Sequence, residues 1–188
     1  MTLPLFRRLL GADFERLPAP VRELHSLSET TATAGRADIA AAPGLAAWFL
    51  RWFAGLPQPG HDVPVSVTFH IEGQGQERWE RQFATRRYSS TMMAGTGEAK
   101  GLLFEYFGLF RLYFRLTVRA DGLGWSLVRW RFLGLPLPRW TAPSIECLES
   151  ADGARFVFDI DFAFPVVGHV MHYRGWIERT VASAQSPT

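Results

Sequence analysis

The chain has 188 residues, of which 47% are hydrophobic and 14% aromatic, and its formal net charge is +2. This length is typical of one domain and is enough to bury a sizeable core. The arginines are scattered among acidic residues, whereas a nucleic-acid groove needs clustered basic charge, so nucleic acid is excluded as an expected partner. Fifteen Phe and seven Trp predict a thick core, an apolar cavity or a partner surface.

Cysteine usage and targeting signals are both sparse. Cys147 is the only cysteine, so no internal disulfide is possible. The first eleven residues lack the order of charge, apolar core and cleavage site of a signal peptide. No apolar run approaches the ~20 residues of a membrane span. We therefore expect a soluble cytoplasmic protein without a transmembrane segment, and peripheral membrane association stays open.

Short helices are expected near the N-terminus. Residues 3–10 form an amphipathic pattern that ends at Gly11, a residue type that stops helices. Pro20 suits the first turn of a second short helix over residues 21–25. Between these helices and the next one, only a weak strand is expected, over residues 36–41.

The stretch 44–54 is the one clearly helical segment. Its large apolar residues recur at helical spacing, and Arg51 is its only charged residue. Membrane-surface helices usually carry a basic polar face, which this segment lacks. We expect it to be a buried helix that packs on the sheet rather than a membrane-surface element.

From residue 60 onward the chain alternates between apolar and polar residues. The segments 110–118 and 156–164 alternate almost perfectly, so each places its large apolar side chains on one face of a strand. Asp121-Gly122 and Asp152-Gly153 are typical of hairpin turns. The expected strands cover residues 63–71, 77–84, 86–94, 101–107, 109–119, 124–133, 143–149, 155–164 and 168–178.

Consecutive hairpins without an intervening long helix predict an antiparallel sheet, and a long sheet of this kind curls to protect its edges. The predicted fold class is α+β, mostly β: a strongly curved antiparallel meander or partial barrel covered by short N-terminal helices. We expect one domain over 1–182, with a helical part over 1–60 and the sheet over 61–180. A disordered tail is expected over 183–188.

Charged residues fall on the polar face of the predicted strands. Asp159 and Asp161 lie two apart in one strand and share a face, where paired carboxylates can bind a metal or exchange protons. Cross-strand Arg–Asp pairs on a solvated face also account for them and are the preferred interpretation. If that face is concave, the same groups would instead line a polar pocket. The arginines available as partners are Arg111, Arg115, Arg129 and Arg131.

Other candidate chemistry is weak. His169 and His172 lie an odd number of residues apart in a strand, so they are expected on opposite faces unless Gly168 begins a bulge. Cys147 has no local base and is interpreted as a structural core residue. Motifs of hydrolases, zinc peptidases and nucleotide-binding loops are missing from the sequence. We therefore expect no metal, no cofactor and no catalytic residues.

Several motifs are spread along the chain: Leu3 to Gly11, Leu17-Pro18, Val21-Arg22 with Leu24-His25, Val63-Pro64-Val65, Arg131 to Pro138, Phe158-Asp159 and His172-Tyr173-Arg174-Gly175-Trp176. Together they resemble an uncharacterised bacterial family, domain of unknown function 4166. That family is sometimes joined to a dinucleotide-binding domain of the saccharopine-dehydrogenase type, so the resemblance implies an accessory role beside an oxidoreductase. It implies no catalytic residues. The C-terminal motif is compatible with a functional edge and equally with a strand that closes a barrel.

Three functions remain open on these observations. The first is a binding module with an apolar, sheet-lined cavity for a lipid-like or other hydrophobic small molecule, which we prefer because no catalytic set is present. The second is an accessory domain that docks on a partner such as an oxidoreductase. The third is an enzyme with a polar Asp/His/Arg site. The candidate ligand-binding residues are Arg129, Arg131, His172, Arg174, Trp130 and Phe158.

Overall fold

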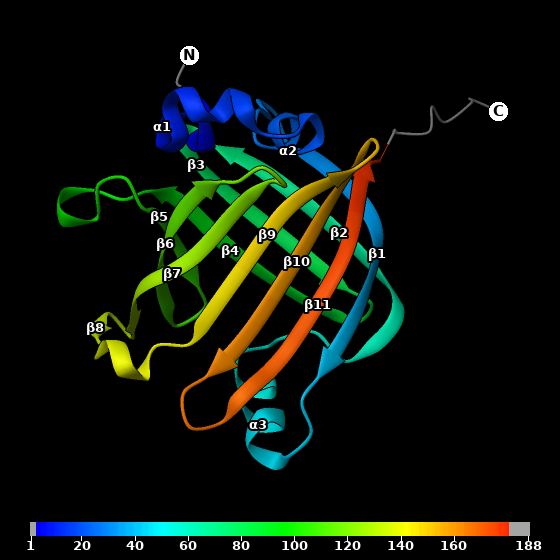
Figure 1. Cartoon of the computed structure of the whole chain (residues 1–188), viewed down its shortest axis with the longest axis vertical. Coiled ribbons are helices and arrows are strands. Elements are labelled where there is room, and N and C mark those ends of the chain that lie inside the picture. Colours follow the sequence, from blue (N-terminus) through cyan, green and yellow to red (C-terminus); the bar gives the residue numbers. More distant parts are fainter. Residues whose placement is uncertain (1–2, 181–188) are drawn as a thin grey trace.

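Ten antiparallel strands wind into a closed barrel in the computed structural model, which describes residues 3–180 (Figure 1). The expected tail over 183–188 lies outside the described residues. A two-residue strand, β8 (Leu135–Pro136), adds to the end of one barrel strand. The barrel strands are β1 (Thr31–Ala41), β2 (Gly60–Glu72), β3 (Gln76–Phe83), β4 (Arg86–Ala94), β5 (Leu103–Phe107), β6 (Phe110–Val118), β7 (Leu123–Phe132), β9 (Ser144–Asp152), β10 (Arg155–Phe164) and β11 (Gly168–Arg179).

Each barrel strand pairs with the strands that flank it in the chain, and β1 pairs with β11 to complete the ring. The register at that seam runs from Thr33 opposite Arg179 to Ala41 opposite Met171. The predicted antiparallel meander is confirmed, but the barrel is closed rather than partial. Closure satisfies the backbone groups that an edge strand would leave unpaired, which is why a coiled sheet of this length joins its two ends.

Alternation along the strands separates an apolar interior from a polar exterior. On β6, Leu112 and Phe114 are buried while Arg115 is exposed, and on β10 Phe158 is buried while Asp161 is exposed. The hydrophobic core therefore runs along the inside of the barrel rather than between two layers.

One end of the barrel is filled by the N-terminal helices, which lie across it at the top of Figure 1. Phe6, Phe14 and Val21 are fully buried there, so this end is a packed plug. Short helices were predicted here. However, β1 spans Thr31–Ala41, so the expected helical part over 1–60 includes a full barrel strand, longer than the weak one predicted. The helical segments of the plug are α1 (Leu5–Leu10), the 3-10 turn η1 (Gly11–Arg16) and α2 (Ala19–Leu24).

The helix α3 (Leu45–Phe53) lies at the opposite end of the barrel, at the bottom of Figure 1. Ala47 is its only buried residue, while Trp48 and Trp52 are each 55% exposed. The prediction that this helix would be buried against the sheet is wrong, because the strands close on one another and leave no open face to cover. None of the helices in the described part of the chain is long and apolar enough to span a membrane.

Three short 3-10 turns complete the fold. They connect consecutive strands and contribute no layer of their own. They are η2 (Gly73–Gly75), η3 (Gly97–Ala99) and η4 (Arg139–Thr141).

Candidate ligand-binding cavity

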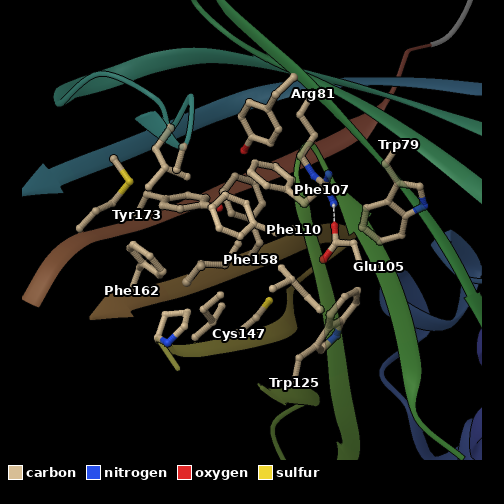
Figure 2. Close-up of a pocket in the computed structure, with 18 of the residues that line it drawn as sticks. Trp79, Arg81, Glu105, Phe107, Phe110, Trp125, Cys147, Phe158, Phe162 and Tyr173 are labelled. Atoms are coloured by element: carbon tan, nitrogen blue, oxygen red, sulfur yellow. Dashed lines mark ion pairs between the residues drawn. The ribbon is translucent and has the colours of Figure 1, made fainter. Parts of the chain in front are cut away.

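The barrel contains a cavity of about 210 Å³ that is lined by side chains from strands around the ring (Figure 2) and by Leu50 and Phe53 of α3. This volume exceeds the ~150 Å³ of an engineered apolar cavity that admits benzene. Most of the lining is aromatic or aliphatic. Six of these apolar lining residues are Leu50, Phe110, Trp130, Phe158, Ile160 and Phe162.

A charged pair interrupts this apolar lining. Arg81 on β3 and Glu105 on β5 both point into the lumen, with Nη2 of Arg81 3.8 Å from Oε1 of Glu105 (Figure 2). Their side chains are only 17% and 10% exposed. Arg81 also donates a hydrogen bond from Nη1 to the Ser90 hydroxyl at 2.8 Å. Its guanidinium lies 4.9 Å from the centre of the Trp79 ring, so stacking fixes its position as well.

Two tyrosines add hydroxyl groups to the same lumen. Tyr88 on β4 and Tyr173 on β11 both line the cavity. Burial raises the pKa of both phenols, that of Tyr173 to well above its usual value. Both side chains therefore stay protonated across the physiological range and can donate or accept hydrogen bonds.

Cys147 on β9 also faces the cavity. Burial raises the pKa of its thiol well above the usual value, and the nearby Glu149 carboxyl acts in the same direction. A nucleophilic cysteine needs the opposite shift. The thiol is therefore an inert part of the lining, in agreement with its interpretation as a structural residue.

A second polar cluster lies beneath the N-terminal plug. The Nε2 atom of His25, which belongs to the plug, is 2.7 Å from Oε2 of Glu149 on β9, and both side chains are buried. The Phe6 ring stacks on His25 with 3.6 Å between the ring centres. Glu77 accepts a hydrogen bond from Nε1 of Trp79 at 3.1 Å, and burial raises the pKa of its carboxyl. This cluster ties the plug to the barrel wall.

The sequence analysis missed these interior charged residues. A signal was present, because each occupies a position in phase with the large apolar residues of its strand. On β3, Glu77 and Arg81 alternate with Trp79 and Phe83, and on β5 Glu105 lies between two apolar residues of the same face. A charged residue at a core position of a strand is the pattern that would have indicated polar groups inside the barrel.

The structure divides the predicted ligand-binding residues between the two sides of the wall. Trp130 and Phe158 line the cavity. The other four members of the set lie on the outside of the barrel. The polar groups inside the lumen instead include those of Arg81, Glu105, Tyr88 and Tyr173. On β7, the Nη1 atom of Arg129 is 3.7 Å from Oε2 of Glu98. The remaining three are Arg131, His172 and Arg174.

Outer-wall pairs account for the Asp and His residues of β10 and β11. His172 Nε2 lies 2.7 Å from Oδ1 of Asp159, and Arg174 Nε lies 3.8 Å from Oδ2 of the same residue. His169 Nε2 lies 3.1 Å from Oδ2 of Asp161. These contacts are cross-strand pairs between part-exposed or exposed side chains, the type of interaction preferred in the sequence analysis. The predicted partners were wrong, because the partners come from the neighbouring strand β11 and not from Arg111, Arg115, Arg129 or Arg131.

A bulge corrects the expectation for the two histidines of β11. The register between β10 and β11 shifts between Phe162 and Ala163, which leaves the buried Val170 as an extra residue. The extra residue restores the parity, so His169 and His172 lie on the same outer face rather than on opposite faces. Among residues 3–180, even so, no group of three or more His, Cys, Asp or Glu side chains is arranged to hold a metal ion.

Comparison with known proteins places the chain in one family. No curated protein matches it, and no solved structure matches it. A family model described as a domain of unknown function does match, over residues 17–177. That range includes all ten barrel strands up to the final residues of β11, together with α2 and α3. The chain therefore belongs to the family Domain of unknown function (DUF4166).

Proposed function

We propose that the protein binds a small, largely apolar molecule in the barrel lumen, with one polar group of that molecule directed at Arg81 and Glu105. The observation that carries the proposal is this buried charged pair inside an otherwise apolar cavity. Burying two charges costs more free energy than burying two hydrophobic side chains of equal size. Stability alone therefore does not explain why a charged pair occupies this position. Ligand sites commonly combine an apolar lining with a few polar groups.

The charge balance of the lumen indicates the chemistry of the ligand. Glu105 already neutralises Arg81, so a ligand carboxylate or phosphate would leave an excess negative charge next to Glu105. A neutral group that both donates and accepts hydrogen bonds, such as a hydroxyl, suits the pair and the nearby Tyr88 hydroxyl. The cavity of about 210 Å³ limits the apolar part to a ring or a short chain.

The arrangement of the two barrel ends indicates the route of entry. The end beneath α1 and α2 is blocked by fully buried side chains such as Phe6. At the other end the cavity reaches Leu50, Phe53 and Leu56 of α3 and its following turn. In the described structure this end has no packed plug like that of the N-terminal helices, so we infer that the ligand enters beside α3.

Native mass spectrometry of the freshly purified protein, followed by solvent extraction, tests for a ligand retained from the host. Calorimetric titration with 1-octanol and with octanoate tests the chemistry. We expect 1:1 binding of the neutral alcohol and at least about tenfold weaker binding of the carboxylate, because a buried like-charge contact disfavours it. An apo mass combined with no binding of either compound would overturn the proposal.

A pair of neighbouring substitutions provides the control. Cys147→Phe places a ring in the cavity, whereas Glu146→Phe places the same ring on the exposed outer face of β9. We expect the first to abolish octanol binding and the second to leave it unchanged. Equal binding by both variants would show that the alcohol binds outside the lumen.

A further inference from the structure

Exposed hydrophobic side chains gather at the α3 end of the barrel. Among the described residues, the large exposed hydrophobic side chains all belong to this end except Leu3 and Tyr106. Five of them lie on α3: Leu45, Trp48, Phe49, Trp52 and Phe53. We call these five, with the exposed residues of the adjoining turns, the apolar rim.

The barrel topology explains why separate segments contribute to one rim. In an antiparallel barrel, successive turns lie alternately at the two ends. The turns after β1, β3, β5, β7 and β10 therefore share one end with α3 (Figure 1). They add further exposed apolar residues to the rim, namely Leu109, Leu133, Leu135, Trp140 and Val166.

The charge at this end is strongly one-sided. The segments at the α3 end together contain six arginines and a single acidic residue, Asp62. Within the described side chains, Arg51, Arg86, Arg87, Arg111 and Arg131 form no ion pair. The segments at the α3 end are residues 42–62, 84–87, 107–111, 131–143 and 164–168. The six arginines are Arg51, Arg86, Arg87, Arg111, Arg131 and Arg139.

The opposite end of the barrel carries balanced charge. Its segments contain eight basic and ten acidic residues, several of them in ion pairs such as Arg7 with Glu15 and Arg155 with Glu178. The excess of positive charge is therefore specific to the end that carries the apolar rim. The segments at the opposite end, beside the N-terminal helices, are residues 3–30, 72–77, 95–101, 118–123, 151–155 and 178–180.

Two of the six arginines at the α3 end directly face each other. Arg111 on β6 and Arg131 on β7 are cross-strand partners, a placement of like charges that destabilises a sheet unless an anion lies between them. The Nε atom of Arg131 is buried and has no hydrogen-bond partner in the described structure. A phosphate oxygen near these two side chains would supply both the counter-charge and the missing acceptor.

We propose that the apolar rim docks on the surface of an anionic lipid bilayer, with α3 inserted among the headgroups and the arginines bound to lipid phosphates. Exposed Trp side chains favour the membrane interface, and unpaired arginines favour its negative potential. A protein partner would require acidic groups placed to match six arginines around an apolar centre. An anionic bilayer offers negative charge and an apolar interior at every point of its surface. The proposal does not depend on a lumen ligand.

Flotation of the full chain with lipid vesicles tests the proposal. We expect binding to vesicles of phosphatidylcholine with phosphatidylglycerol and much weaker binding to phosphatidylcholine alone. Raising NaCl from about 0.1 M to about 1 M should release most of the protein, because salt shortens the screening length. Trp48→Ser with Trp52→Ser removes the two stacked, half-exposed rings and should abolish binding without unfolding the barrel.

Matched substitutions at the two ends separate docking from general effects. Leu45→Ser should weaken vesicle binding, while Leu3→Ser at the plug should not. Arg87→Gln at the rim should weaken it by about fivefold, and Arg119→Gln at the plug end should leave it unchanged.

Two outcomes would overturn the proposal. One is failure of the wild-type chain to bind anionic vesicles. This outcome includes the case in which the chain forms dimers through the rim and the rim substitutions abolish the dimers. The other is equal loss of binding by the variants at both ends. If the wild-type chain binds octanol but does not bind vesicles, the proposed function is retained and only the proposal of membrane docking is overturned.

Discussion

Arg81 and Glu105 approach each other on the inner wall of the barrel with 3.8 Å between Nη2 and Oε1, although β4 separates their two strands. Ser90 on β4 accepts the hydrogen bond of Arg81 and so bridges the gap. Three consecutive strands therefore share one polar contact inside an apolar wall. Under the proposed function, this contact orients the polar group of the ligand.

Substitution of this pair separates its effect on stability from its effect on binding. Glu105→Leu leaves Arg81 buried without a counter-charge and should lower the free energy of unfolding by about 3–5 kcal/mol. The double substitution Arg81→Met with Glu105→Leu should restore most of that loss, because a hydrophobic pair needs no desolvated charge. Urea unfolding measures both values. A double variant as unstable as the single one would mean that the pair itself stabilises the barrel.

Glu77 predicts a specific dependence of stability on pH. Burial raises the pKa of this carboxyl in the folded state, so the folded chain holds the proton more tightly than the unfolded chain does. Its contribution to stability is therefore present at low pH and is lost as pH rises from the unfolded pKa through the folded one. Glu77→Gln should stabilise the protein more at about pH 7.5 than at about pH 4.

Urea midpoints at the two pH values measure this difference. Glu98→Gln serves as the control, because the Glu98 side chain is 91% exposed and its titration should change stability little. An equal gain from Glu77→Gln at both pH values would contradict the assignment.

The single cysteine reports on the state of the lumen. Cys147 lines the cavity, and burial raises the pKa of its thiol, so the folded protein should react with a thiol reagent at least about a hundredfold more slowly than the urea-unfolded chain. A bound ligand should slow the reaction further. The absorbance change of an aromatic disulfide reagent follows the rate. A folded-state rate close to that of the unfolded chain would show that the lumen is open to water.

A glycine at the barrel seam should resist any side chain. A Cβ atom added to Gly35 on β1 would lie 1.7 Å from the carbonyl oxygen of Trp176 on β11. Because the obstacle is backbone, Gly35→Ala should lower the free energy of unfolding by about 3 kcal/mol or more. Gly73→Ala is the control, since a Cβ there meets nothing within 4 Å. Similar midpoints for both variants in thermal unfolding would show that the seam can adjust.

The strands were predictable because their side chains alternate with a period of two, as in the segment from Phe110 to Val118. Closure was not, since the pairing of β1 with β11 depends on the coiling of the whole sheet and on no local pattern. The placement of His169 was missed for a related reason. A one-residue bulge at Val170 reverses the faces of everything beyond it, and only the register against β10 reveals it.

The candidate sites show the same division. Trp130 and Phe158 were selected for their apolar phase and do line the cavity. Arg81 was not predicted, because its position is in phase with the apolar residues of β3, where a charged side chain is not expected. For α3, the single charge of Arg51 argued against a membrane surface, but the other rim arginines come from strand ends that are distant in sequence. Only the three-dimensional arrangement gathers them around one helix.

The pairing of β1 with β11 also determines the order in which the chain can fold. Thr33 is opposite Arg179, so the first strand of the barrel remains without one of its partners until the last strand has been synthesised. Contacts of such long sequence separation slow folding, because a large loop must be closed before they form. Until then, the nascent chain presents two open strand edges, and the interval before ring closure is the period in which this protein is most exposed to aggregation.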